Sequence, residues 1–199
     1  IKRYGYNWAN LWLINSHNGI RGKLERIHIE DYPAVKEHLD QYWDKISKRA
    51  DKGDTPYNLR NCAYLEDFSK PKVMWKIIGC NINFSFDETN KVCNNAVDIM
   101  TGKRNQLLQF VGLMNSKLFD WYLKLTTEAE VQGGGIQLYV TTLEKTLLKL
   151  DFPNNLNEVT EQRLNGLVSD EDVDKTIYSL YNLTKEEIDF IHFCKQVNR

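Results

Sequence analysis

The sequence predicts an α+β fold, in which mixed, twisted β-structure packs against helices and a helical appendage follows at the C-terminus. Three observations lead to this prediction. Short segments rich in β-forming residues alternate with turn residues between positions 72 and 100, an apolar helix occupies most of 107–125, and the chain becomes acidic and helical after Pro153. Because 42% of the 199 residues are apolar and 12% are aromatic, the chain can bury a hydrophobic core.

Two strands and a helix are predicted in the first third of the chain. Residues 9–14 and 23–29 are expected to be strands, with Gly19 and Gly22 in the turn between them. The apolar residues that follow recur at helical spacing and predict a helix that ends before a loop at 51–56: Val35, Leu39, Tyr42, Trp43, Ile46 and Ala50.

Further strands are predicted in the middle of the chain. Residues 72–78 and 81–86 are expected to pair around Gly79, because both segments are rich in apolar residues and the glycine suits the turn. Residues 96–100 and 136–140 are also rich in apolar residues and are expected to be strands as well.

A long buried helix is predicted between these strands. Within 107–125, twelve of nineteen residues are apolar and they cover most of the helix circumference. Asn115 and Ser116 are expected to break this helix in two, because both side chains compete for backbone hydrogen bonds. The segment 128–135 is expected to be flexible, and 141–150 to form a short helix followed by a final strand.

The chain is predicted to divide into a domain at residues 1–153 and a C-terminal helical appendage at 154–199. Ser169 and Asp172 have the spacing of a capping box, and so do Thr184 and Glu187. The charge also changes near this boundary: residues 1–150 carry 21 basic and 17 acidic side chains, and residues 151–199 carry 5 and 10.

Sequence motifs for several functions are absent. There is no glycine-rich phosphate-binding motif, no Asn-Pro-Pro-Tyr type tetrad, no Gly-x-Ser-x-Gly, and no metal-ligand spacing among the four histidines. We therefore expect this chain to be no enzyme by itself and to hold neither a cofactor nor a metal. The longest apolar run is four residues, which excludes a transmembrane helix. The four cysteines form no Cys-x-x-Cys pair and suggest free thiols in a reducing cytosol.

Four short segments occur in an order that is more specific than any one of them. They are Ile1-Lys2-Arg3-Tyr4, Tyr57-Asn58-Leu59-Arg60, Phe68-Ser69-Lys70-Pro71-Lys72-Val73-Met74-Trp75 and Leu113-Met114-Asn115-Ser116-Lys117-Leu118-Phe119-Asp120-Trp121-Tyr122. Together they resemble the TaqI-like C-terminal specificity domain. This family provides the target-recognition module of adenine-specific DNA methyltransferases and of type IIG restriction-modification enzymes. The three glycines at 133–135 and the helical segment at 177–188 also fit this resemblance.

The resemblance implies a cytoplasmic module of DNA methylase specificity-domain type whose loops enter a groove of double-stranded DNA. It further implies a separate N-terminal methyltransferase domain of the same polypeptide, which would hold S-adenosylmethionine and flip the target adenine out of the base stack. The parent enzyme would be an adenine-specific DNA methyltransferase, and an additional endonuclease activity stays open. Consistent with this, the opening at Ile1 suggests a fragment of a longer protein, and no membrane partner is expected.

Candidate DNA contacts fall into two groups. Basic residues between 45 and 76, interleaved with aromatic residues, suit a phosphate backbone. The glycine run and its two flanking glutamines suit close approach to a groove, since glutamine can bond adenine. The expected phosphate contacts are Lys48, Arg49, Arg60, Lys70 and Lys72, and the expected groove-side residues are Gln132, Gly133, Gly134, Gly135 and Gln137.

Other interpretations of these residues remain open. Arg60 could form an internal salt bridge or contact a guanine edge, the two lysines around Pro71 could be a solvated start of a strand, and the glycines could be a plain mobile loop. For the whole chain, two alternatives remain: a separate specificity subunit that works with a methylase partner, and a protein-interaction domain without nucleic-acid binding. The net charge of −1 and the acidic tail favour the last.

Overall fold

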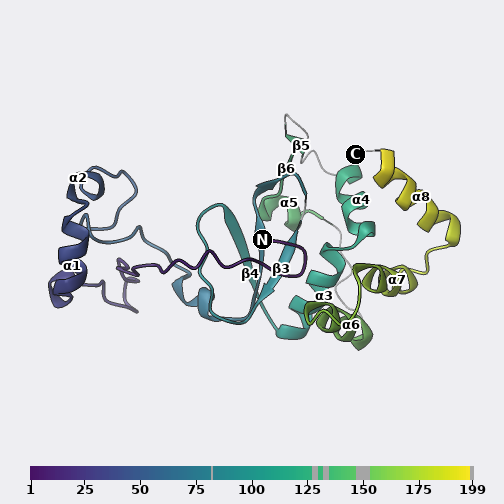
Figure 1. The fold of residues 1–199 in the computed structure, drawn as a ribbon, viewed down its shortest axis with the longest axis horizontal. Helices are drawn as coiled ribbons and strands as arrows, with labels where there is room; N and C mark the ends of the chain where they lie inside the picture. Colours follow the sequence, from purple (N-terminus) through teal and green to yellow (C-terminus); the bar gives the residue numbers. More distant parts are fainter. Residues whose placement is uncertain (82, 127–129, 132–134, 147–152, 198–199) are drawn as a thin grey trace. The chain divides into compact units, whose positions relative to one another are not determined.

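The computed structural model describes residues 1–81, 83–126, 130–131, 135–146 and 153–197, and its ribbon is drawn in Figure 1. The chain forms two compact units. Unit 1 comprises Ile1–Ala9 and Asp67–Arg199, and unit 2 comprises Asn10–Glu66. Helices and small antiparallel sheets are both present, which confirms the predicted α+β class. Among the described residues, no helix combines the length and the apolar character needed to cross a membrane.

The central sheet of unit 1 has three antiparallel strands in the order β3-β1-β4. This arrangement confirms the predicted pairing of 72–78 with 81–86 and the predicted strand at 96–100. In the register between β1 and β3, Lys72 lies opposite Asp87. The bounds are β1 Lys72–Lys76, β3 Phe84–Asp87 and β4 Val97–Thr101.

A second small sheet has the order β2-β6-β5. Its strands are β2 Ile78–Gly79, β5 Glu130–Val131 and β6 Gly135–Gln137. The predicted strand at 136–140 is therefore confirmed only in its first part, because the short helix α5 Val140–Glu144 begins at its last residue. The predicted final strand within 141–150 falls mostly outside the described residues.

Two helices cover the central sheet, and they meet where the sequence predicts a break. Asn115 lies between α3 Arg104–Met114 and α4 Lys117–Thr126. Its side-chain amide donates to the carbonyl of Phe84 at 2.8 Å, and its Oδ1 accepts from the Phe84 amide at 3.0 Å. Asn115 thus satisfies the backbone of β3 instead of continuing a helix. The Ser116 hydroxyl accepts from the amide of Phe119 and begins α4.

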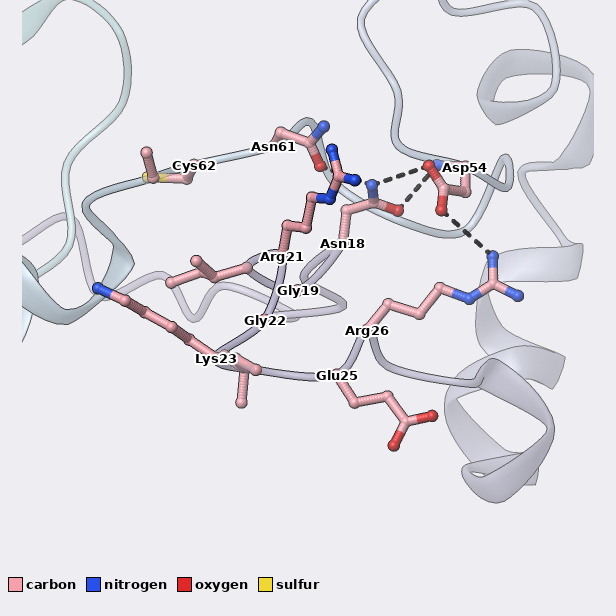
Figure 2. A pocket seen from close by; sticks show the side chains of 13 residues that line it. Asn18, Gly19, Arg21, Gly22, Lys23, Glu25, Arg26, Asp54, Asn61 and Cys62 are labelled. Atoms are coloured by element: carbon pink, nitrogen blue, oxygen red, sulfur yellow. Dashed lines mark hydrogen bonds and ion pairs between the residues drawn. The ribbon is translucent and has the colours of Figure 1, made fainter.

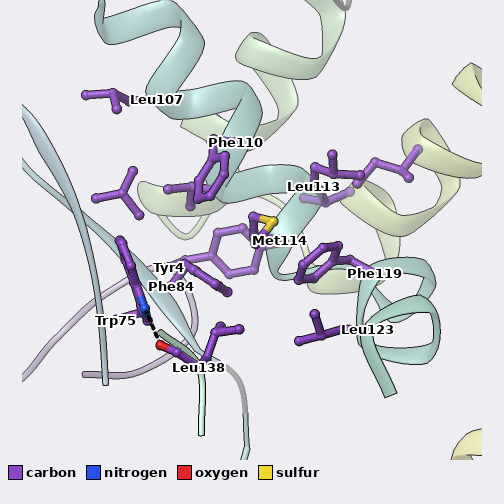
Figure 3. Packing of buried hydrophobic residues seen from close by; sticks show 14 of the residues in the cluster. Tyr4, Trp75, Phe84, Leu107, Phe110, Leu113, Met114, Phe119, Leu123 and Leu138 are labelled. Atoms are coloured by element: carbon purple, nitrogen blue, oxygen red, sulfur yellow. Dashed lines mark hydrogen bonds between the residues drawn. The ribbon is translucent and has the colours of Figure 1, made fainter. Parts of the chain in front are cut away.

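The core of unit 1 lies between the sheet and these helices, as Figure 3 shows. Phe84 from β3 is fully buried at its centre, and its ring is 5.7 Å from Trp75 and from Phe110 and 6.4 Å from Phe119. The indole N–H of Trp75 donates to the carbonyl of Leu138, which ties the second sheet to the core. The predicted burial of 107–125 is therefore confirmed for α3, whose residues 107–114 are buried, whereas α4 buries only Phe119 and Leu123.

The C-terminal helices pack into the same core. Leu156, Val173 and Ile177 are fully buried in this apolar cluster. Both predicted capping boxes are confirmed: Ser169 and Asp172 bond reciprocally, and so do Thr184 and Glu187. The division of the chain at residue 153 stays a prediction. The helices are α6 Asn154–Leu164, α7 Asp170–Leu180 and α8 Lys185–Val197.

The first residues of the chain are held by both the sheet and the C-terminal helices. The Tyr4 amide donates to the carbonyl of Phe84 at 2.9 Å, and the Tyr4 side chain is buried. Arg163 of α6 lies over the Tyr4 ring at 5.0 Å, and the Arg3 guanidinium is 3.2 Å from Asp170 of α7. Residues 1–9 therefore belong to unit 1 although unit 2 follows them in the chain.

Unit 2 contains short helices and long irregular segments. The single helix predicted over the apolar residues from Val35 to Ala50 is present as two helices whose apolar residues are not buried. The strand predictions at 9–14 and 23–29 are wrong: both segments are irregular, apart from an isolated bridge between Ile20 and Leu24. The predicted turn is confirmed, since Gly19 and Gly22 both have positive φ. The helices are η1 Ile29–Asp31, α1 Pro33–Asp40 and α2 Trp43–Ile46, and η2 Leu65–Ser69 crosses into unit 1.

A side chain replaces the expected strand pairing in unit 2. The buried Asn58 amide donates to the carbonyl of Ile27 at 2.9 Å and to those of Ser16 and His17 at 3.4 Å. The Ser16 hydroxyl donates to the carbonyl of Tyr57 at 2.7 Å. These bonds satisfy backbone groups that a strand ladder would otherwise satisfy, so the chain is fixed here without a sheet.

Candidate nucleic-acid interface

Three of the expected phosphate contacts lie in unit 2, and their surroundings differ. Lys48 is exposed just after α2, so its ammonium is accessible to a ligand. Arg60 is also exposed and makes an ion pair with Asp51 at 3.4 Å, with more than 70% of both side chains open to solvent. Such an exposed pair contributes little to stability and can exchange its partner for a phosphate.

Arg49 has a structural role in unit 2. Its guanidinium donates to the carbonyl of Pro56 at 3.1 Å and to that of Asn58 at 2.5 Å. These two bonds hold the loop that precedes Asn58 against the end of the helical segment. A group that already serves two backbone carbonyls is a poorer phosphate ligand than the exposed Lys48.

The two lysines around Pro71 in unit 1 have opposite environments. Lys70 is exposed and lies 2.6 Å from the Asp67 carboxylate. The Lys72 side chain is fully buried, and its Nζ donates to Asp87 at 2.5 Å and to the carbonyl of Phe68 at 2.8 Å. This geometry corrects the expectation for Lys72: its ammonium is enclosed and cannot reach a phosphate. Lys70 keeps the position expected for a surface contact.

The partner of Lys72 is the centre of a hydrogen-bonded cluster. Burial alone would raise the pKa of Asp87, but hydrogen bonds from Lys72, Tyr6 and Thr89 outweigh this and lower the pKa to about 2. Asp87 also accepts from the backbone amide of Lys91 at 3.0 Å. The cluster fixes the end of β3 and the loop after it, and it presents no free charge to a ligand.

The expected groove-side residues are only partly described. Gln132, Gly133 and Gly134 lie outside the described residues. Gly135 begins β6, and Gln137 ends it, half-buried and opposite Ile78 of β2. The Gln137 side-chain amide donates to the hydroxyl of Tyr139. Gln137 and Tyr139 therefore form a small polar pair at the end of β6, the central strand of the second sheet.

Unit 2 also has an open hollow of about 810 Å³ that the sequence prediction missed. Figure 2 shows that the turn between Gly19 and Arg26 forms one wall and that Asn61 and Cys62 lie opposite. The only signal of it in the sequence is the spacing of Gly19 and Gly22 near basic residues, and this spacing predicts no more than a turn. Its lining comprises residues 18–26, 54 and 61–63.

A polar network fixes one side of this hollow. The Asn18 amide donates to Asp54 at 3.0 Å and to Asn61 at 2.6 Å, and its Oδ1 accepts from the Asp54 amide at 2.8 Å. Arg26 lies 3.7 Å from the Asp54 carboxylate. Gly53 belongs to this network as well, because a Cβ built there would lie 2.5 Å from Oδ1 of Asn18. The hydrogen bonds of Asn18 therefore connect the segment that contains it to the segments around Asp54 and Asn61.

Within the described ranges, no group of three or more histidine, cysteine, aspartate or glutamate side chains is placed to hold a metal ion. The expected site residues are divided between the two units, with Lys48, Arg49 and Arg60 in unit 2 and Lys70, Lys72, Gly135 and Gln137 in unit 1. The hollow of unit 2 adds two exposed basic residues, Arg21 and Lys23.

A family model described as TaqI-like C-terminal specificity domain matches residues 1–146, which is about three quarters of the chain. None of the curated proteins matches.

Proposed function

The chain belongs to the TaqI-like C-terminal specificity domain family, and we propose that it recognises the DNA target of a larger adenine-specific DNA methyltransferase, including the type IIG restriction-modification enzymes. The observation that carries this proposal is the family match, which includes both the central sheet of unit 1 and all of unit 2. A specificity domain is not catalytic. In the proposed enzyme, binding of S-adenosylmethionine and transfer of the methyl group belong to an N-terminal methyltransferase domain, in the cytoplasm.

Two kinds of surface support a DNA-binding role. Lys48, Arg60 and Lys70 are exposed cations, which suit contacts that position a duplex without reading its sequence. Gln137, at the end of the central strand of the second sheet, has the amide chemistry that can read adenine in the major groove. The proposal assigns phosphate contacts to the lysines and Arg60, and base contacts to the segment around Gln137.

The exposed apolar residues of unit 2 support a protein partner in addition to DNA. Ile29 is the one apolar side chain of unit 2 that is buried, whereas Leu11 and Trp12 are 77% and 86% exposed. Clustered exposed apolar residues mark interaction surfaces. We assign 11–14 to the contact with the methyltransferase domain. Hydrogen exchange that is equally fast at 11–14 with and without that domain would contradict this assignment.

Binding of the 199-residue chain to duplex DNA tests the proposed function. We expect weak and mostly sequence-independent binding, with a dissociation constant of about 10⁻⁴ to 10⁻⁶ M at physiological salt. Lys48→Ala and Lys70→Ala should each flatten the plot of log affinity against log salt by about 0.9, while Gln137→Ala should leave the slope unchanged. The measurement is fluorescence anisotropy at several salt concentrations.

The matched control is Lys175→Ala, because this lysine is 73% exposed but lies on the acidic helix α7. It should leave both affinity and slope unchanged. Calorimetric titration with S-adenosylmethionine should give no heat beyond dilution, since the cofactor is assigned to the other domain. Absence of DNA binding at low salt, or micromolar binding of the cofactor, would refute the proposed function.

A further inference from the structure

The hollow of unit 2 is built around a rigid turn. The Lys23 amide donates to the carbonyl of Ile20 at 2.9 Å, and Ile20 and Leu24 exchange backbone bonds of 2.8 and 2.9 Å. Gly22 has φ +74°, a conformation that the third residue of a type II turn requires. The turn therefore fixes the backbone at the two residues beside Gly22, Arg21 and Lys23, whose side chains are exposed.

The glycine before this turn allows two backbone segments to touch. Gly19 has φ +76°, and a Cβ built on it would lie 2.5 Å from the carbonyl oxygen of Leu24 and 2.7 Å from the amide nitrogen of Arg26. No side chain fits at this position without moving the backbone. The close approach of these segments gives the hollow its wall.

The charges around the hollow do not cancel. Arg26 is paired with Asp54, and the Glu25 carboxylate lies 3.4 Å from His28 and points away from Arg21 and Lys23 in Figure 2. In the described part of the chain, neither Arg21 nor Lys23 has a carboxylate within ion-pair distance, so both cations remain available. Opposite them, Asn61 uses its Oδ1 to accept from Asn18, which leaves its own Nδ2 group as a donor.

We propose that this hollow binds a phosphate group of the DNA backbone, a proposal that rests on the proposed function. The Arg21 guanidinium can donate two parallel hydrogen bonds to one phosphate, and the Asn61 amide near it supplies a neutral donor. The Lys23 ammonium, which points away from Arg21 in Figure 2, adds positive charge on the other side of the turn. The turn fixes where the Arg21 and Lys23 side chains leave the backbone, and both residues line the hollow. The hollow positions the duplex and does not read its bases.

Salt-dependent binding of the 199-residue chain to duplex DNA tests this site. Arg21→Ala and Lys23→Ala should each weaken binding and flatten the log–log salt slope by about 0.9. Gly19→Ala should have a similar effect although it removes no charge, because it displaces the turn. Lys175→Ala is the matched control for the loss of one exposed lysine. Thermal unfolding measures whether each variant remains folded, and the exposed Arg21 and Lys23 variants should melt as the wild type does.

Each outcome separates this inference from the proposed function. If the wild-type chain binds no DNA at low salt, the proposed function fails and this inference fails with it. If the wild type binds and the slope changes only for Lys48→Ala and Lys70→Ala, the proposed function stands and the hollow is not a DNA contact. Titration with inorganic phosphate, followed by the amide resonances of Gly22 and Lys23, tests a free anion as the ligand. Saturation by phosphate without any effect of Arg21→Ala on DNA binding would overturn the inference.

Discussion

Lys70 and Lys72 lie two positions apart in the chain, yet their side chains have opposite environments. The Lys70 ammonium forms a solvent-exposed ion pair with Asp67, whereas the Lys72 ammonium forms a fully buried ion pair with Asp87. An exposed ion pair contributes little to stability because water and salt screen it. A buried pair that loses one partner leaves an uncompensated charge in the interior, which is costly.

This contrast gives a stability prediction. Lys72→Ala should lower the free energy of unfolding by about 3–5 kcal/mol, because Asp87 would keep a buried charge without its cation. Lys70→Ala should cost less than about 1 kcal/mol. Urea denaturation of both variants measures the difference. Equal losses for the two lysines would mean that Lys72 is not enclosed as described.

Asp87 also predicts how unit 1 responds to acid. Its pKa of about 2 in the folded protein lies below the ordinary value of 3.8, so folding favours the ionised form. The resulting stabilisation, about 2 kcal/mol, is fully present above pH 4 and is lost as the pH falls from about 4 to about 2. Urea denaturation between pH 6 and pH 2.5 should show this loss in the wild type. Asp87→Asn should show a shallower loss over the same range, and identical slopes would contradict the assignment.

Close packing of two helices sets the position of the C-terminal segment. Gly112 lies in the last turn of α3, and a Cβ built there would overlap the Thr160 hydroxyl of α6 and lie 3.2 Å from a methyl group of Leu156. Thr160 is fully buried, and its hydroxyl has no hydrogen-bond partner among the described residues. The absence of a side chain at 112 therefore allows α6 to approach α3.

A double-mutant cycle tests this contact. Gly112→Ala should destabilise the wild type through overpacking, which typically costs about 1–3 kcal/mol, partly offset by the better helix propensity of alanine. In a Thr160→Ala background the same substitution should cost less, because the overlapping hydroxyl is gone. Thermal or urea unfolding of the four proteins gives the coupling energy. The same cost in both backgrounds would show that the two helices do not meet at these residues.

Elements with a strong local signal could be predicted from the sequence. The start of α4 at Ser116 and the capping boxes at Ser169 and Thr184 depend on side chains that bond to nearby backbone, so their spacing was sufficient. The strand predictions at 9–14 and 23–29 failed for a non-local reason. The side-chain amide of Asn58, more than thirty residues after 23–27, donates to the carbonyl of Ile27. In a sheet, a backbone amide of a neighbouring strand would donate to this carbonyl.

At the scale of the whole molecule, the core of unit 1 joins the two ends of the chain. Tyr4 from the first segment and Ile177 from α7 belong to the same apolar cluster, although the family match ends at residue 146. The C-terminal helices are therefore part of the folded unit. Hydropathy alone could not predict this, because the apolar face of a helix does not indicate which other surface of the protein it packs against.

The candidate site was predictable only in part, because burial and shape depend on the fold. Lys72 was misassigned because its partner Asp87 comes into register only through the pairing of β1 with β3. The hollow of unit 2 was missed because Asn18, Asp54 and Asn61 are brought together by tertiary structure. Exposed single cations such as Lys48 could be predicted, since a charged side chain is exposed by default.

The chain leaves unit 1 after Ala9 and returns to it at Asp67, and the described core of unit 1 takes no side chain from the residues between. The codons for the core of unit 1 and the codons for unit 2 therefore lie in separate stretches of the gene. A recombination event with breakpoints near codons 10 and 66 would exchange an entire surface while leaving the core intact. Such an exchange would replace the phosphate contacts assigned to Lys48, Arg60 and the hollow, while the base contacts assigned to the segment around Gln137 would stay with unit 1.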